Sequence, residues 1–334
     1  MKQLKTKKQI TTWLMVLLAV TSFISCKKDD SVAAIDNNKI NLVIADNFNL
    51  ASFSAALRLS TLDKELQQGA GPYTIMAPSD AAFITAGYND ATAVLSASPS
   101  VIAPMVRYHV FDGSYELNKL PFLFNQELRS RGGKMFATHW VKNGDTVLTL
   151  NGARVVAQNL PTSNGIIQVI NRVLTPYLHD KLGDAISAES NVTLFTQALK
   201  TSGVLATING TGPYTIFAPD NTAMRSIGYQ SVQQVSQTDP AVLRELVNYH
   251  ILRDRRFIND YVLSTGSTNT SRQAMLDDNL VDITLTPDVN SPGSFNGITL
   301  RGIGNINEIQ VVKQDVLTGN GVLHVINGAL KIIQ

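Results

Sequence analysis

The sequence is poor in cysteine, and few of its residues are charged. Its 334 residues include a single cysteine, Cys26, so no intramolecular disulfide and no cysteine-based zinc or iron–sulfur site can form. Charged residues make up 16% of the chain, too few for a coiled coil, and the 44% of hydrophobic residues are too many for a disordered chain. The composition therefore indicates a globular protein with a substantial core.

Neither sign of charge is in large excess. The formal net charge is +2, but four lysines precede residue 25, and the rest of the chain has 24 basic against 26 acidic residues. A near-neutral mature chain lacks the electrostatic footprint that nucleic-acid binding requires. We therefore expect no nucleic-acid partner.

Enzyme motifs are also missing. The sequence contains no His-Glu-x-x-His, no Gly-x-Ser-x-Gly, no Walker-type loop and no Gly-x-Gly-x-x-Gly. Several hard oxygen donors crowd residues 277–290, but they lack the ligand spacing of a calcium loop. We predict no catalytic residue, cofactor or metal, with a hydrolase that uses an unrecognised acid pair as a remote alternative.

The first 25 residues have the layout of an export signal. A basic stretch to Lys8 precedes an apolar run at 13–20 that is too short to span a bilayer unaided. Cys26 follows the small Ser25 and resembles the lipidated cysteine of a bacterial lipobox, although Phe23 stands where leucine is usual. The next four residues, Lys-Lys-Asp-Asp, resemble the export tag of Bacteroidetes surface lipoproteins. We expect an outer-membrane, lipid-anchored, surface-exposed protein with a tether at 26–37; periplasmic retention is the alternative.

A long internal repeat organises the remainder. Three segments recur in the same order, the first two at a spacing of 141 residues and the third at 156. Repeats of this length exceed solenoid units and indicate tandem domains with separate cores, at 38–178 and 179–334. The matched pairs are Gly71–Pro78 with Gly212–Pro219, Tyr108–Val110 with Tyr249–Ile251, and Asn164–Asn171 with Asn320–Asn327.

Helix signals come early in each copy and strand signals late. Apolar residues at i, i+4 predict a helix near 53–57 and near 195–199, each followed by a short strand that ends at a proline. Ser79 and Asp220 are placed to cap the next helix, and Ser98-Pro99 and Asp239-Pro240 the one after it. Asn-Gly hairpin signals at 143–144 and 151–152 precede a closing strand at 165–171. This order predicts an α+β fold.

The repeated segments resemble the signatures of the fasciclin (FAS1) domain family. The stretches at 76–83 and 217–224 are similar to its Phe-Ala-Pro signature, the Tyr-His pairs to its central motif, and 164–174 and 320–330 to its second signature. Met224 and Gln168 depart from the pattern, whereas His324 matches it. The resemblance implies two wedges of strands packed with small helices, an adhesion or matrix role, and no enzymatic activity.

Candidate binding residues are few. Tyr108, His109, Tyr249 and His250 lie on apolar helix stripes, where a ring hydrogen-bonded to backbone is the expected role, so we interpret them as motif residues of the fold. His139 next to Trp140 could form an exposed aromatic contact, but a strand aromatic that covers the core is the stronger interpretation.

The second copy has 15 more residues than the first, which include turn-rich segments at 286–297 and 302–307. Long loops on a rigid scaffold often carry function, although a tolerated surface insertion is the alternative. One ring and several amides suit sugar or peptide contact, which makes Phe295, Asn290 and Asn296 candidate ligand residues together with Trp140.

These features favour a non-enzymatic, surface-anchored adhesion or ligand-binding lipoprotein whose partner is an extracellular protein or polysaccharide. An accessory glycan-binding component of an outer-membrane uptake system, in complex with a transporter, is the alternative. That alternative rests on analogy with other lipidated proteins of the same bacterial group.

The anchor is directly testable. Substituting Cys26→Ala should abolish acylation and release the protein from the membrane fraction, because the substitution removes the only thiol. Palmitate labelling and fractionation measure both effects. The lipoprotein hypothesis would be refuted if the wild type took up no palmitate and the variant stayed in the membrane fraction.

Overall fold

Each copy of the repeat folds around a seven-stranded sheet, and the two sheets share one topology. The computed structural model describes residues 36–289 and 294–332, and residue 38 begins one compact unit. The first sheet has the order β2-β1-β7-β6-β5-β4-β3 and the second β10-β11-β12-β13-β14-β8-β9. The first-sheet strands are β1 (Tyr73–Pro78), β2 (Val110–Asp112), β3 (Gln126–Ser130), β4 (Gly133–Lys142), β5 (Asp145–Leu150), β6 (Ala153–Thr162) and β7 (Gly165–Ile170). The second-sheet strands are β8 (Tyr214–Pro219), β9 (Ile251–Leu252), β10 (Thr270–Ala274), β11 (Leu280–Pro287), β12 (Phe295–Gly302), β13 (Ile309–Thr318) and β14 (Gly321–Ile326).

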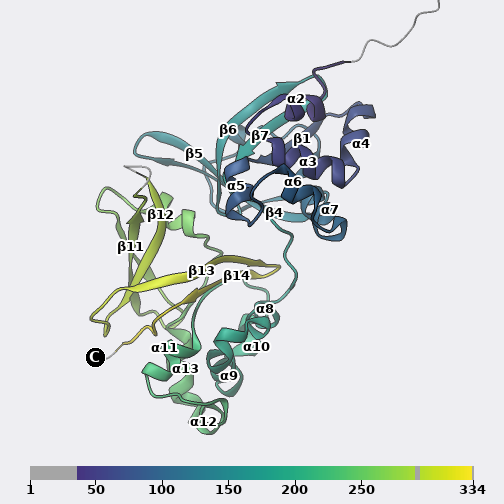
Figure 1. The fold of residues 1–334 in the computed structure, drawn as a ribbon. Helices are drawn as coiled ribbons and strands as arrows, with labels where there is room; N and C mark the ends of the chain where they lie inside the picture. Colours follow the sequence, from purple (N-terminus) through teal and green to yellow (C-terminus); the bar gives the residue numbers. More distant parts are fainter. Residues whose placement is uncertain (1–35, 290–293, 333–334) are drawn as a thin grey trace, which may run out of the picture. The chain divides into compact units, whose positions relative to one another are not determined.

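Short helices accompany each sheet, and in Figure 1 those of the first copy gather beside β1 and β7. In the first copy they are α2 (Ile40–Asp46), α3 (Ala51–Leu59), α4 (Leu62–Gln68), α5 (Asp80–Thr85), α6 (Ala91–Leu95), α7 (Pro99–Tyr108) and the 3-10 helix η2 (Leu117–Lys119). In the second they are α8 (Leu182–Ala188), η3 (Ser190–Val192), α9 (Thr193–Thr201), α10 (Val204–Ile208), α11 (Asn221–Ser226), α12 (Val232–Gln237), α13 (Pro240–Asn248) and α14 (Ile258–Ser264). The predicted α+β class and the tandem arrangement are confirmed. Within the described ranges, no helix is long and apolar enough to cross a membrane.

The expected caps form at most of the predicted helix starts. The side chains of Ser79, Asp220 and Asp239 each accept a hydrogen bond from a backbone N–H of the first turn, at 3.3, 2.7 and 2.8 Å. Such bonds satisfy donors that a helix start leaves unpaired. Ser98 is the exception, because its hydroxyl pairs with Ser100 and makes no capping bond.

A parallel strand pair lies at the centre of each sheet. β1 pairs with β7 from Tyr73 opposite Gly165 onward, and β8 pairs with β14 in the same way; every other strand pair is antiparallel. Ile75 belongs to the core on the helix side of the sheet, whereas its neighbour Met76 belongs to the core on the other side. A central strand covered on both faces is apolar at successive positions, which explains the unbroken apolar run of the repeat.

The amide of a repeated asparagine ties each closing hairpin to the first helices of its domain. Asn164 accepts from the backbone N–H of Ile40 at 2.9 Å and donates to the carbonyl of Leu66 at 2.7 Å. Asn320 repeats this arrangement with Leu182 and Ile208, at 2.9 and 2.8 Å. These bonds join chain segments more than 95 residues apart.

The glycine of the Gly-Pro turn fits beneath the same hairpin. Gly71 has φ +73°, and a Cβ atom there would lie 2.2 Å from the Asn164 carbonyl oxygen. Gly212 has φ +63° and the equivalent approach to Asn320 is 2.5 Å. Only glycine combines a positive φ with so close a backbone contact.

Each domain has its own pair of apolar cores, and a small fifth cluster joins the domains. The fifth cluster contains Phe136 of β4 with Phe257 and Val322 of the second domain, all at most 4% exposed. Apolar contact is therefore one part of the docking, and the main cores of the domains do not depend on it.

Fragments 38–178 and 179–334 should each fold alone and unfold cooperatively, because each contains two complete cores. Loss of the fifth cluster exposes Phe136 or Phe257, so each fragment should be less stable than in the full chain by about 1.5–3 kcal/mol. Urea titrations followed by circular dichroism measure this difference. Insoluble or unfolded fragments would show that the copies share one core.

Candidate functional site

The repeated Tyr-His histidines are buried structural links. His109 and His250 are 0% exposed, and the Nδ1 atom of each bonds the backbone carbonyl four residues earlier, at 2.8 Å. The Nε2 atoms accept from the backbone N–H groups of Leu174 and Leu330, at 3.1 and 2.9 Å. Both rings are therefore neutral and carry the proton on Nδ1. Burial lowers the pKa of both imidazoles to about 4.

The hydroxyl groups of the neighbouring tyrosines each donate one hydrogen bond and accept another. The Tyr108 hydroxyl donates to the carbonyl of Lys134 at 2.6 Å and accepts from Asn151 Nδ2 at 2.8 Å. The Tyr249 hydroxyl donates to the carbonyl of Leu280 at 2.7 Å and accepts from the N–H of Ile303 at 3.0 Å. Burial raises the pKa of both phenols. The motif fastens the helix side of each domain to its sheet and has no free group for a partner.

Gln168 and His324 occupy equivalent positions in the two copies and make equivalent hydrogen bonds, although the residue type differs. His324 Nδ1 accepts from the backbone N–H of Asp315 at 3.1 Å, and Gln168 Oε1 accepts from that of Asn159 at 3.0 Å. The Nε2 atom of Gln168 also bonds the carbonyl of Tyr115, and the Nε2 atom of His324 bonds that of Arg256. A glutamine amide therefore replaces the imidazole without loss of either contact.

The aromatic candidates of the first domain cover its surface strands. His139 is 2% exposed and lies 4.3 Å from the ring of Phe122, measured between centroids. Trp140 is half-buried and its ring is 4.7 Å from that of Phe124. Two aromatic side chains thus pack on the strand, which agrees with the stronger of the two sequence interpretations.

Strands take up both ends of the first turn-rich segment, 286–297, which is therefore a shorter loop than expected, whereas most of the second segment, 302–307, lies in the connection between β12 and β13, as expected. Thr286 pairs with Gly297 and Pro287 with Phe295, so β11 and β12 extend into the segment. Phe295 is half-buried and packs on the core of its domain, whereas Asn296 is exposed. The loop was overestimated because alternation in Thr286–Pro287 is too short to identify a strand. Asn290 and Cys26 lie outside the described residues.

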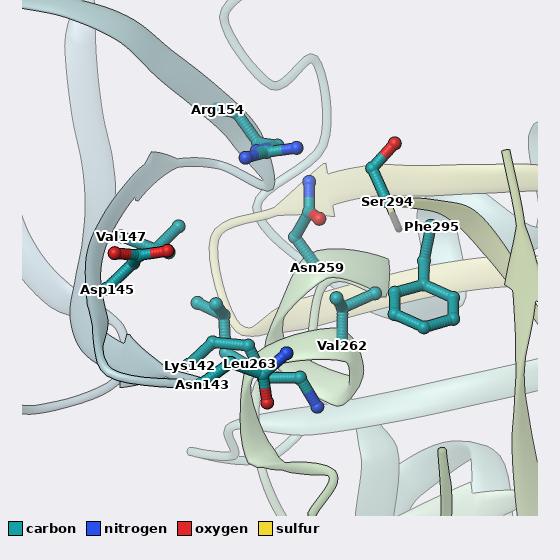
Figure 2. A pocket seen from close by; sticks show the side chains of 10 residues that line it. All are labelled: Lys142, Asn143, Asp145, Val147, Arg154, Asn259, Val262, Leu263, Ser294 and Phe295. Atoms are coloured by element: carbon teal, nitrogen blue, oxygen red, sulfur yellow. The ribbon is translucent and has the colours of Figure 1, made fainter. Parts of the chain in front are cut away.

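Phe295 instead lines a cavity of about 160 Å³ to which both domains contribute. Figure 2 shows Asp145, Arg154 and Phe295 on different sides of this cavity. The lining side chains come from the β4–β6 hairpins of the first domain and from α14 and β12 of the second. The ten described lining residues are Lys142, Asn143, Asp145, Val147, Arg154, Asn259, Val262, Leu263, Ser294 and Phe295.

The cavity has an apolar side and a polar side. Val262 and Leu263 of α14 are at most 9% exposed and lie with the Phe295 ring on the apolar side. On the polar side, the carboxylate of Asp145 and the guanidinium of Arg154 are exposed. Neither group has an ion-pair or hydrogen-bond partner among residues 36–289 and 294–332. Unpaired groups of both signs next to apolar surface can bind a polar ligand.

Two other polar residues connect the cavity walls. The Lys142 ammonium donates to the carbonyls of Thr265 and Gly266, and burial lowers its pKa. The Asn259 amide nitrogen donates to the carbonyl of Gly152. Since all three bonds cross between the domains, the cavity wall depends on domain docking.

A buried carboxylate next to Asn259 fixes the docking. Asp260 is 0% exposed and accepts from Thr138 Oγ1 at 2.9 Å, from Asn125 Nδ2 at 3.2 Å and from the N–H of Phe257 at 2.9 Å. Burial raises the pKa of this carboxyl to about 6, while the hydrogen bonds from Phe257, Thr138 and Asn125 act in the opposite direction.

Two arginines complete the junction. The Arg255 guanidinium stacks 3.6 Å from the Phe136 ring centre, and burial lowers its pKa to about 10. Arg172, in the connection between domains, forms an ion pair of 2.7 Å with Asp315. No pattern in the sequence pointed to Asp260 or Arg255, because Thr138, Asn125 and Phe136, which they contact, lie in the other copy. Asp315 stands where the first copy has Asn159, and this charge change was the available clue.

No metal-binding cluster accompanies the cavity. Within the described part of the chain, no group of three or more His, Cys, Asp or Glu side chains is placed to hold a metal ion.

The chain belongs to the fasciclin domain family, which it matches at residues 48–176 and again at 190–332. Each match falls within one of the two seven-stranded domains. The resemblance of the repeated signatures to this family is therefore confirmed, with two FAS1 domains in tandem.

Several animal proteins are similar to the chain. It is 31% identical to human periostin over 196 residues, which are 59% of this chain and 21% of periostin. It is 25% identical to pig transforming growth factor-beta-induced protein ig-h3 over 263 residues, 79% of this chain and 35% of that protein. Fasciclin-1 of Drosophila melanogaster is 27% identical over 215 residues, 61% of this chain and 31% of that protein. The chain thus spans between 21% and 35% of the length of these relatives.

A solved structure of a FAS1 domain pair from the insect cell adhesion molecule Fasciclin I also matches. The match covers 87% of this chain and 95% of that one, at 16% identity and a TM-score of 0.41.

The buried histidines predict acid sensitivity. Because the folded-state pKa of His250 is about 4, below the ordinary 6.5, the unfolded chain binds more protons between these values. The stability contributed by the neutral ring is complete above pH 6.5 and is lost as the pH falls toward 4. The free energy of unfolding should fall by up to about 1.4 kcal/mol per pH unit for each such histidine. Asp260, whose pKa is raised, should make the free energy of unfolding rise as the pH falls.

His250→Gln should lower stability at pH 7 by about 1–3 kcal/mol through its lost hydrogen bonds. Between pH 6.5 and 4.5 its stability should fall less steeply than that of the wild type, and His109→Gln should behave alike because its ring makes the same bonds. Urea titrations across this pH range measure both slopes. Identical slopes in wild type and variants would mean that these imidazoles are not the buried neutral groups described.

Proposed function

We propose that this protein is a non-enzymatic adhesion or ligand-binding protein whose two FAS1 domains recognise an extracellular protein or polysaccharide. The observation that carries the proposal is that both domains belong to one family, whose members include an insect cell adhesion molecule. Fold alone does not define function, so the polar groups must be considered as well.

The internal use of three of the five histidines supports a binding role over a catalytic one. His109, His250 and His324 bond protein groups through both ring nitrogens, so none is poised as a general base. The unpaired charges described above lie instead at an open cavity, where they suit ligand binding.

We also propose that a lipid on Cys26 holds the domains at the outer membrane, facing outward. Support comes from the sequence alone, in which the cysteine ends an export signal and precedes a Lys-Lys-Asp-Asp segment. Several acyl chains attach a protein stably, and a tether at 26–37 would separate the domains from the membrane surface.

A binding screen with an activity control tests the proposal. The full chain, purified in mild detergent, should bind at least one member of an array of glycans and matrix proteins saturably. Urea-unfolded protein, the control, should not bind, because recognition requires the folded domains. The same preparation should release no product from fluorescently labelled polysaccharides.

Absence of saturable binding across the array would contradict the adhesion role. Product release that scales with protein concentration would favour the hydrolase alternative instead.

A further inference from the structure

We propose that the cavity between the two domains binds a single acidic sugar unit, a uronate, of an extracellular polysaccharide. This inference rests on the adhesion function proposed above and names the ligand and the place where it binds. Three properties of the cavity carry it: an apolar face, a net positive charge that includes the Arg154 guanidinium without a partner among the described residues, and a small volume.

The apolar face suits the C–H face of a pyranose ring. The Phe295 ring borders the cavity together with the aliphatic side chains of Val262 and Leu263. Sugar rings present C–H groups on one face and hydroxyls around their edge, so an aromatic wall and a polar rim match their two surfaces.

The polar rim selects an acidic sugar. Lys142 and Arg154 are opposed by the single acid Asp145, which leaves one positive charge in excess among the described lining residues. The Arg154 guanidinium has no partner in the described part of the chain, and its planar fork matches a carboxylate.

Acceptors for hydroxyl groups complete the rim. The Asp145 carboxylate and the Asn259 amide oxygen have no hydrogen-bond partner among the described residues. Carboxylate and amide oxygens accept from hydroxyls, which an acidic peptide side chain does not offer. A ligand with both a carboxylate and hydroxyls is therefore favoured over a peptide.

The volume limits the ligand to one unit. A cavity of about 160 Å³ is below the range of roughly 300–1,000 Å³ typical of sites for drug-sized ligands. One sugar ring would occupy it, with the rest of the chain outside.

The site is composite, because its walls come from both domains. Asp260, next to Asn259 on α14, bonds Thr138 of β4 and so holds the apolar wall against the polar one. Neither domain alone contains both walls.

Calorimetry on the full chain tests the site. The probes are oligomers of galacturonate, glucuronate and mannuronate, their carboxyl-reduced neutral counterparts, and an oligoglutamate peptide. Arg154→Gln should weaken binding of the preferred uronate oligomer about 10- to 100-fold, since hydrogen bonds to charged groups contribute about 1.5–3 kcal/mol. The thermal unfolding midpoint should not change, because Arg154 is exposed and has no partner among the described residues.

Arg107→Gln is the matched control. Arg107 is an exposed arginine of the same domain, on α7, and does not line the cavity. It should leave binding unchanged, which separates local recognition from loss of net charge.

Four outcomes would overturn the inference. They are equal weakening by both variants, equally tight binding of the reduced oligomers, binding of oligoglutamate in place of uronates, and no uronate binding by a chain that still binds other array members. In the last case the adhesion function would stand and only the site would fail. A chain that binds nothing on the array would defeat both.

Discussion

The parallel strand pair at the centre of each sheet is the constraint on which each domain depends. β1 and β7 are separated by the whole of the intervening domain, so their pairing fixes the path of everything between them. The ends of the pair are held by polar bonds: Tyr73 N–H donates to the Asn164 carbonyl at 2.9 Å, and Ser79 N–H to that of Ile170 at 3.0 Å. The Gly-Pro turn, the Asn164 amide and the His109 ring all surround this pair, which accounts for their recurrence at matching places in the second copy.

The polar side chains of the Tyr-His motif hold the fold together, and they are therefore buried and not exposed on the surface. The imidazole of His250 and the phenol of Tyr249 are buried and saturated by backbone partners. A partner could reach either group only after local unfolding, which would cost the hydrogen bonds that link helix to sheet. In the folded domains, these motif groups are therefore not accessible to a partner.

One difference between the copies lies at their junction. The first domain has the short helix η2 where the second has the longer α14, and α14 carries both Asn259 and Asp260. One of these residues lines the cavity and the other anchors the helix to Thr138. Docking and the proposed binding site are thus built by adjacent residues. Burial of the Asp260 carboxylate carries a desolvation free energy, as its raised pKa indicates. Its hydrogen bonds in turn fix the position of α14 against β4.

The sequence by itself determined the repeat, the order of helices and strands, most caps and the burial of the Tyr-His pair, because these follow from local periodicity and from chemistry repeated within each copy. It placed both ends of the 286–297 segment, Phe295 included, in a loop, since strand pairing of Thr286 with Gly297 is decided by partners and not by local propensity. Only the tertiary structure decided the junction. Asp260, Arg255 and Arg154 have no periodic signal, and their surroundings come from chain segments that are brought together when the domains dock. Contacts between distant segments depend on the geometry of both surfaces, which no local pattern in one sequence encodes.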